Sequence, residues 1–149
     1  VGVSKGTITE CSFKNGSIYG LENPDCAGGV CGKLERQGKI TNSNASGDLK
    51  GKKYIGGICG EIMNGTVKDC YCDVFVYKQT RRTRDITKKH DVGLAFGNIS
   101  GGKTTVKNSY ILNGQQNIPS IGNRTPRKDE FEIHRDTDLS EEELKVIMM

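Results

Sequence analysis

One short glycine-rich pattern recurs along this chain and constrains its fold more than any other feature. Gly-Gly-Val-Cys-Gly at residues 28–32 returns as Gly-Gly-Ile-Cys-Gly at 56–60 and, in a weaker form, as Gly-Leu-Ala-Phe-Gly at 93–97. The copies are separated by 28 and then 37 residues. Periods of this length are typical of repeat proteins, in which each unit packs only against its neighbours.

A second block accompanies the glycine-rich one and has its own columns. When its four copies are aligned, successive columns hold aliphatic residues (Ile8, Ile40, Val67, Val106), acidic or amide residues (Glu10, Asn42, Asp69, Asn108), small residues (Cys11, Ser43, Cys70, Ser109) and apolar or small residues (Phe13, Ala45, Cys72, Ile111). The apolar alternation changes parity across the acidic or amide column. This change predicts a bend in the strand, because Asn and Asp tolerate the left-handed backbone that a corner requires.

The repeats predict an all-β fold, a short right-handed parallel β-solenoid of about four coils. A unit with two short strands cannot bury a hydrophobic face alone, whereas stacked copies place equivalent residues ~4.8 Å apart in ladders. Helical solenoids are disfavoured by the 20 glycines among 149 residues and by the β-branched columns. We expect the aliphatic column to point inward and the corner side chains to hydrogen-bond the backbone.

The repeat pattern divides the chain into two parts. We assign residues 1–120 to the β-solenoid and residues 121–149 to an exit loop and a short capping or linking helix. Ser140, followed by Glu143, is a capping box that starts this helix. We expect the helix either to cover the end of the last coil or to lead into the next domain of the parent protein. Because the chain begins inside a patterned segment, we interpret it as a piece of a longer protein, with the rest of the parent chain at both ends.

The residues also resemble a known repeat. Gly-Gly-Val-Cys-Gly, a short gap and then Gly-x-Ile-x-Asn-Ser, with a second copy from Gly56 to Cys70, resembles the GLUG repeat, and the resemblance covers roughly residues 1–114. The copy from Val92 departs, since Leu94 replaces its second glycine. The resemblance implies a solenoid segment of a large secreted or surface-attached bacterial protein, as in some IgA-specific metallopeptidases and adhesin-like proteins. It implies an extracellular or cell-surface location and no catalytic residue.

The cysteines allow two interpretations. They are Cys11, Cys26, Cys31, Cys59, Cys70 and Cys72. An even number in a secreted chain is typical of a disulfide framework. The columns favour buried free thiols instead, because most of these positions hold small or apolar residues in other repeats. No metal is expected, since Cys70-x-Cys72 lacks a second pair at zinc spacing.

A basic segment between Val76 and Asp91 explains the longer spacing of the third repeat. Its positive residues are Lys78, Arg81, Arg82, Arg84, Lys88 and Lys89, against the single acidic residue Asp85. This cluster indicates a contact with a polyanion, such as a sulfated or sialylated glycan or an anionic cell-wall polymer. A solvated hairpin tip is the alternative. No nucleic acid is expected, because no aromatic side chain is interleaved for base stacking.

No catalytic constellation is found in the sequence. HExxH and Rossmann patterns are missing, and the glycine-rich segments are repeat elements and not phosphate-binding loops. No apolar run reaches the ~20 residues of a membrane helix. We therefore expect no catalytic residue, no cofactor and no membrane insertion. The predicted function is a non-catalytic adhesive or spacer module whose partner is a host glycan, an anionic polymer or a host protein. The alternative is an accessory segment of an IgA-type metallopeptidase that positions substrate for a catalytic domain elsewhere.

Overall fold

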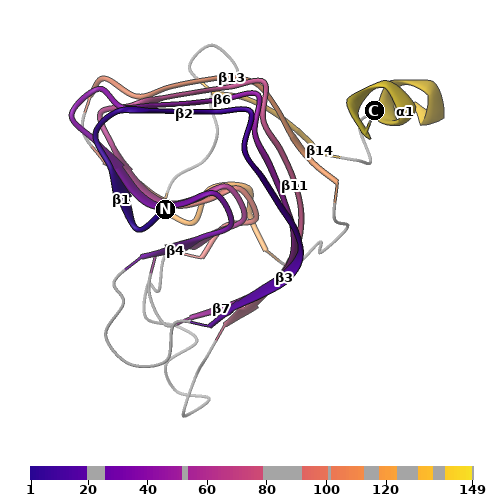
Figure 1. Cartoon of the computed structure of the whole chain (residues 1–149), viewed down its shortest axis with the longest axis horizontal. Coiled ribbons are helices and arrows are strands. Elements are labelled where there is room, and N and C mark those ends of the chain that lie inside the picture. The colour runs from indigo at the N-terminus through magenta and orange to yellow at the C-terminus, as the bar shows by residue number, and fades with distance from the viewer. Residues whose placement is uncertain are drawn as a thin grey trace.

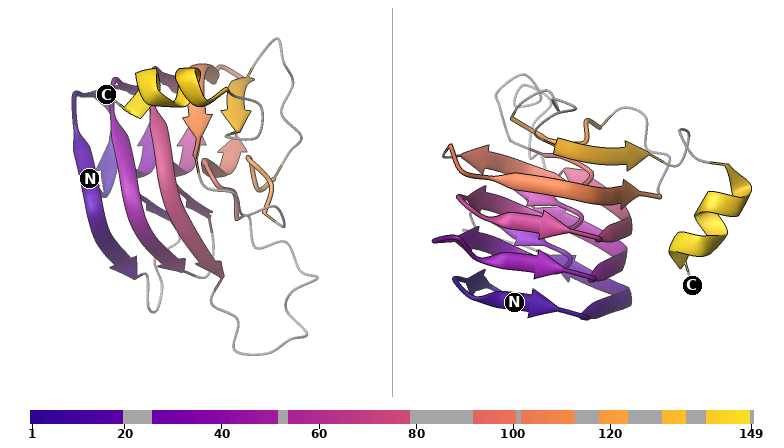
Figure 2. Two further views of the ribbon diagram at one scale, coloured as in Figure 1. Left: turned by 90° about the vertical axis from the view of Figure 1, so that its right-hand side faces the viewer. Right: turned by 90° about the horizontal axis from the view of Figure 1, so that it is seen from above.

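A computed structural model shows how the repeats are arranged. It describes residues 1–19, 26–51, 54–78, 92–100, 102–112, 118–123, 131–135 and 140–148. Nearly all elements in this part are strands, and each strand pairs in parallel with the equivalent strand of the adjacent repeat. Successive repeats overlie one another in projection (Figure 1) and form a layered stack when seen from above (Figure 2). The predicted all-β, parallel, solenoid-like architecture is confirmed.

Two smaller sheets complete the stack, one of four strands and one of two strands. The four-stranded sheet has the order β1 (Val3–Ser4), β5 (Cys31–Glu35), β9 (Cys59–Met63) and β12 (Phe96–Ser100). The two-stranded sheet pairs β4 (Ala27–Gly28) with β8 (Ile55–Gly56). Both are built from the glycine-rich blocks, so the first repeated motif forms these two sheets.

The second repeated block forms a larger sheet that bends at the corner. Its strands are β2 (Thr7–Thr9), β3 (Ser12–Tyr19), β6 (Lys39–Thr41), β7 (Asn44–Gly51), β10 (Thr66–Lys68), β11 (Tyr71–Lys78), β13 (Thr105–Ile111) and β14 (Phe131–Arg135). The path runs β2-β6-β10-β13-β11-β7-β3, and β14 pairs with β13. The sheet turns back because β13 spans the corner, pairing with β10 before the bend and with β11 after it.

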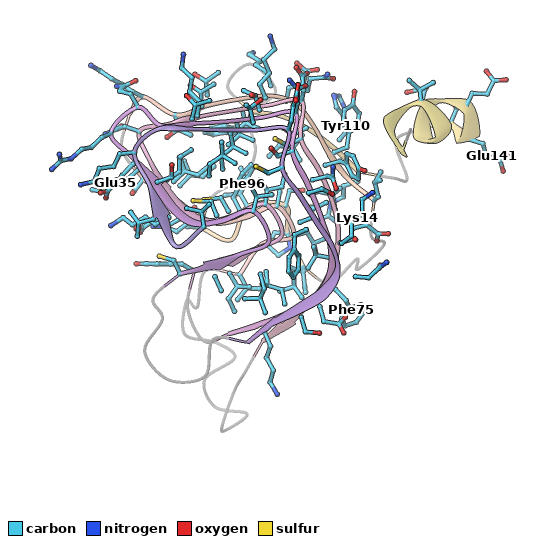
Figure 3. The ribbon with its side chains drawn as sticks, in the orientation of Figure 1. Lys14, Glu35, Phe75, Phe96, Tyr110 and Glu141 are labelled. Atoms are coloured by element: carbon cyan, nitrogen blue, oxygen red, sulfur yellow. The ribbon has the colours of Figure 1, made fainter. Side chains whose placement is uncertain are left out.

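The aliphatic column forms one buried ladder. Each member pairs in parallel register with its equivalent in the next repeat, in the order Ile8, Ile40, Val67 and Val106. None of the four is more than 7% exposed, so the predicted inward orientation is confirmed. Other columns fill the same core, among them Phe96, which lies at its centre (Figure 3).

The glycine pair is explained by close backbone contacts. A Cβ on Gly28, Gly56 or Gly93 would lie 2.0, 2.3 or 2.0 Å from the carbonyl oxygen three residues further on. The second glycine faces β7, since a Cβ on Gly29 would lie 2.4 Å from the Cβ of Ala45. The motif therefore combines a tight turn with a close approach to a small residue.

The predicted corner is present in every repeat. The acidic or amide residue has a left-handed backbone each time, with φ of 52°, 47°, 54° and 48° at Glu10, Asn42, Asp69 and Asn108. The expectation that these side chains bond the backbone is wrong. The small residue that follows makes that bond, because its hydroxyl or thiol reaches the carbonyl oxygen two residues earlier at 2.8–3.4 Å. The donors are Cys11, Ser43, Cys70 and Ser109.

Parallel pairing continues beyond residue 120, where the sequence predicted an exit loop. Ile121 bridges to Phe96, and β14 pairs with β13. The predicted exit region therefore contains a further strand that extends the stack. The register between β13 and β14 shifts between Val106 and Ser109, so this strand does not repeat the spacing of the earlier columns.

The helix begins as predicted but lies elsewhere. In α1 (Glu141–Met148), Ser140 Oγ accepts a hydrogen bond from the Glu143 N–H at 3.2 Å and donates one to its carboxylate at 3.2 Å. The helix lies beside the stack and does not cross its end (Figure 2). Of the two predicted roles, α1 therefore does not take the capping position, whereas the linking role stays a prediction; the helix borders the outer side of the corner.

Candidate functional site

The structure does not test the predicted polyanion site. The backbone of Lys78 ends β11, but the side chain of Lys78 and residues Arg81, Arg82, Arg84, Lys88 and Lys89 lie outside the described residues. Their contact with a polyanion stays a prediction.

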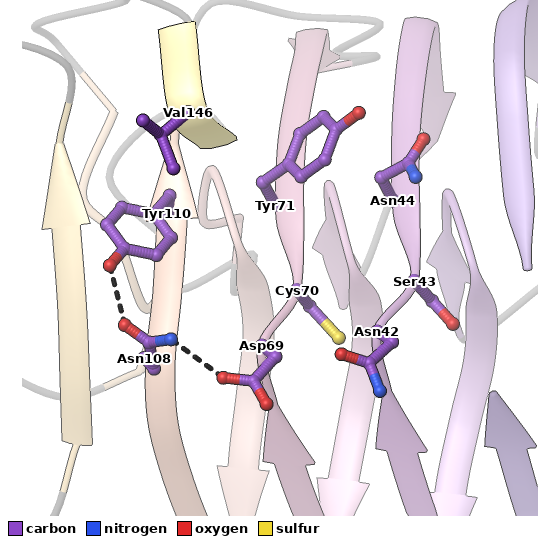
Figure 4. Close-up of a pocket in the computed structure, with 9 residues that line it drawn as sticks. All are labelled: Asn42, Ser43, Asn44, Asp69, Cys70, Tyr71, Asn108, Tyr110 and Val146. Carbon is purple, nitrogen blue, oxygen red and sulfur yellow. Dashed lines mark hydrogen bonds between the residues drawn. The ribbon is translucent and has the colours of Figure 1, made fainter. Parts of the chain in front are cut away.

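A different site lies on the outer side of the corner. It is an open groove of about 350 Å³, shown in Figure 4, which we call the corner groove. Its lining residues are Asn42, Ser43, Asn44, Asp69, Cys70, Tyr71, Asn108, Tyr110 and Val146. All except Val146 of α1 occupy equivalent positions around the bend in successive repeats, so the groove follows the stack.

One side of the corner groove is a row of corner side chains. Asn108 Nδ2 donates to Asp69 Oδ1 at 2.7 Å, and the Tyr110 hydroxyl donates to Asn108 Oδ1 at 2.5 Å (Figure 4). Asp69 and Asn108 are both half-buried. Asn42 continues the row, and within the described part of the chain its side chain has no hydrogen-bond partner. The row thus contains both satisfied and open polar groups.

The other side is a row of one amide and two tyrosine side chains, each two residues further along the chain than its corner residue. Asn44 pairs in register with Tyr71, and Tyr71 with Tyr110. The Tyr110 ring lies 5.2 Å from the ring of His134, at an angle of 31°. Burial, together with the nearby Glu132 carboxylate, raises the pKa of Tyr110. Its hydroxyl is therefore a protonated donor, fixed on Asn108.

The small column forms the floor of the groove. Ser43 and Cys70 are each 1% exposed, and burial raises the pKa of the Cys70 thiol to about 11. Burial also raises the pKa of the thiols of Cys59 and Cys72. A protonated, buried thiol is a poor nucleophile and a poor metal ligand. The Cys70 thiol in the floor therefore contributes to the packing of the groove and not to a reaction.

The cysteines agree with the interpretation as small core residues. Cys31, Cys59, Cys70 and Cys72 are buried, Cys26 is half-buried and Cys11 is exposed, and no disulfide joins any two of them in the structure.

Alkaline pH should destabilise the protein through these thiols. Below about pH 8.5, the ordinary thiol pKa, Cys70 keeps its proton in both the native and the unfolded state. Above it the unfolded state loses the proton first, so Cys70 alone should lower the free energy of unfolding by about 1.4 kcal/mol per pH unit until its native pKa is reached. Urea denaturation across this range measures the slope. Cys70→Ser, which matches the Ser43 and Ser109 of the same column, should make the slope shallower; an identical slope would contradict the assignment.

The four-stranded sheet carries a different surface, in which charges are paired. Lys33 Nζ lies 3.4 Å from a Glu61 carboxylate oxygen and 3.5 Å from one of Glu35, and the Glu61 carboxylate raises the pKa of Lys33. Asn98 Nδ2 donates to the same Glu61 at 2.9 Å. Because these groups satisfy one another, this face offers a ligand fewer open groups than the corner groove does.

In the described ranges, no three His, Cys, Asp or Glu side chains gather closely enough to hold a metal ion. In the same part of the chain, no helix combines the length and the apolar character needed to cross a bilayer.

Comparison with known proteins supports the repeat assignment. A family model described as the GLUG motif matches residues 23–50, which confirms the resemblance found in the sequence. The match covers β4, β5 and β6 and most of β7, and it includes the groove residues Asn42, Ser43 and Asn44. No curated protein and no solved structure matches the chain significantly.

Proposed function

We propose that this chain is a non-catalytic repeat module of a secreted or surface-attached bacterial protein and acts as an adhesive or spacer solenoid. The observation that most supports this is the GLUG motif stacked in one register with its neighbours, from β2 through β6 and β10 to β13. We further propose about four right-handed coils, since parallel crossover connections are right-handed in nearly all known cases.

The stacked register suits a spacer. Each coil adds ~4.8 Å of length and buries its apolar columns against the coil before it. Lengthening such a module requires only further repeats and no new core. The outward side chains recur at the same spacing, so the same architecture also suits multivalent attachment to a repetitive polymer.

The adhesive role is tested through the basic segment. Heparin should bind the chain with an affinity that falls with salt, because release of counterions drives such contacts. R81A/R82A/R84A should weaken the binding about tenfold or more without lowering the melting temperature. The matched control K39A/K68A/K103A removes the same charge from three exposed lysines and should change the affinity little. Equal weakening by both triple variants would contradict a specific polyanion site.

The alternative rests on the same motif, which the resemblance associates with some IgA-specific metallopeptidases. In that case the module positions substrate for a catalytic domain elsewhere in the parent protein. A zinc-binding HExxH in the adjoining sequence would favour this role. Deleting the module should then raise KM for the protein substrate and leave hydrolysis of a short peptide unchanged. A plain spacer would change neither parameter.

A further inference from the structure

We propose that the corner groove binds an uncharged glycan chain laid along the stack axis. This inference rests on the proposed adhesive function and gives it a second ligand class, bound by residues other than those of the basic segment.

The geometry of the groove is periodic in the direction of the stack. The corner row of Asn42, Asp69 and Asn108 and the outer row that contains Tyr71 and Tyr110 run side by side. Within each row, equivalent side chains are one coil apart, ~4.8 Å, which is close to the length of one sugar ring in a polysaccharide. Successive sugars of one chain can therefore meet the same kinds of group in successive coils.

The groove holds polar groups with unused hydrogen-bonding capacity. Among the described residues, the Asn42 amide and the Tyr71 hydroxyl have no partner. Asn44 accepts a bond from Ser12 at 2.7 Å through Oδ1, which leaves its NH₂ group available. Asp69 accepts one bond, from Asn108, and a carboxylate can accept several. Sugar hydroxyls both donate and accept, so they fit this mixture of donors and acceptors.

Aromatic side chains supply the apolar part of the site. Tyr71 and Tyr110 are half-buried, and each combines an apolar ring with a polar tip. The Tyr110 hydroxyl is held by Asn108, and its ring lies against His134. A ring fixed in this way loses little conformational entropy when a ligand packs against it. Val146 adds an apolar contact to the groove lining.

The charge of the groove favours a neutral ligand. The Asp69 carboxylate lies in the middle of the corner row, and no basic side chain among the described residues forms an ion pair with it. A sulfated or sialylated chain would bring like charge against this half-buried carboxylate, which disfavours binding. The corner groove and the basic segment therefore select different glycans.

The test uses the whole chain and a panel of uncharged pentasaccharides, namely cellopentaose, xylopentaose, laminaripentaose, mannopentaose and N-acetylchitopentaose. At least one should bind in isothermal titration calorimetry, with an affinity that is insensitive to salt and much weaker for the corresponding monosaccharide. Tyr71→Ala should weaken this binding about tenfold or more, and Tyr71→Phe, which removes only the hydroxyl, should weaken it less.

Asn42→Gly is the cleanest variant, because glycine keeps the left-handed backbone at φ 47° while the amide side chain is removed. It should weaken pentasaccharide binding severalfold. The matched control is Asn15→Gly, which makes the same change at φ 51° on an exposed residue outside the groove and should leave the affinity unchanged.

The outcomes separate this inference from the proposed function. If heparin binds but no pentasaccharide does, or if Asn42→Gly and Tyr71→Ala bind like the unmodified chain, the corner groove is not a glycan site and the adhesive role stands. If neither heparin nor any glycan binds, the adhesive function itself fails, and the inference fails with it.

Discussion

Gly56→Ala should destabilise the stack by about 3 kcal/mol or more, at the upper end of the usual cost of overpacking. The added Cβ would lie 2.3 Å from the carbonyl oxygen of Cys59, 2.6 Å from Cα of Phe96 and 2.7 Å from the carbonyl oxygen of Ala95. All three are backbone atoms of paired segments, so none can move aside without breaking ladder hydrogen bonds. A loss of this size is a large part of the ~5–15 kcal/mol that stabilises a typical domain.

The control for this prediction is Gly102→Ala. A Cβ at Gly102 would meet no atom within 4 Å, so the same chemical change should shift stability only slightly. Urea denaturation of both variants measures the difference between them. Equal stability of the two would contradict the close backbone approach at Gly56.

The buried ladders could be predicted from the sequence because periodic burial leaves a periodic signal. Ile40 and Val67 lie in the same column of the alignment and are paired in the structure, both fully buried. The glycine pair is equally regular, with one exception at Leu94. Leu94 replaces the second glycine, yet its carbonyl oxygen accepts the Gly57 N–H at 2.8 Å and its side chain is buried. The backbone path is thus kept, although the side chain differs.

The corner groove could not be predicted in the same way. In the sequence, Asn42 and Asp69 indicate only a bend, and Tyr71 occupies one of the polar positions between columns. The bend itself brings positions two residues apart onto one outer side, where register then aligns Tyr71 with Tyr110. The available signal was that a polar residue or a tyrosine stands two positions after each corner residue, and that the last two of the four are Tyr71 and Tyr110.

The last strand was missed because its spacing differs. Between β13 and β14, Val106 pairs with Phe131 and Ser109 with Ile133, so three steps along one strand match two along the other. An alignment of the repeats that keeps the spacing between columns fixed cannot detect a repeat with this shift. The position of α1 was also beyond the sequence pattern, since the capping box at Ser140 determines where a helix starts and not which surface it borders.

Phe96→Ala should produce the largest loss among single truncations of the core, about 3–5 kcal/mol. The Phe96 side chain in β12 is 0% exposed and lies in the centre of the stack (Figure 3). Its backbone pairs with Cys59 on one side and Ile121 on the other. Truncation would remove the contacts of the aromatic ring and leave a cavity that the paired strands on both sides prevent from collapsing.

Phe75→Ala is the matched control, because it makes the same change at a side chain that is 41% exposed, on the outside of β11 (Figure 3). It should cost about 1 kcal/mol or less. Since each coil contacts only its neighbours, Phe96→Ala should also accelerate amide hydrogen exchange in β12 and β13 more than in β6. Equal losses from the two truncations, or uniform acceleration along the chain, would contradict a core built from separate, stacked repeats.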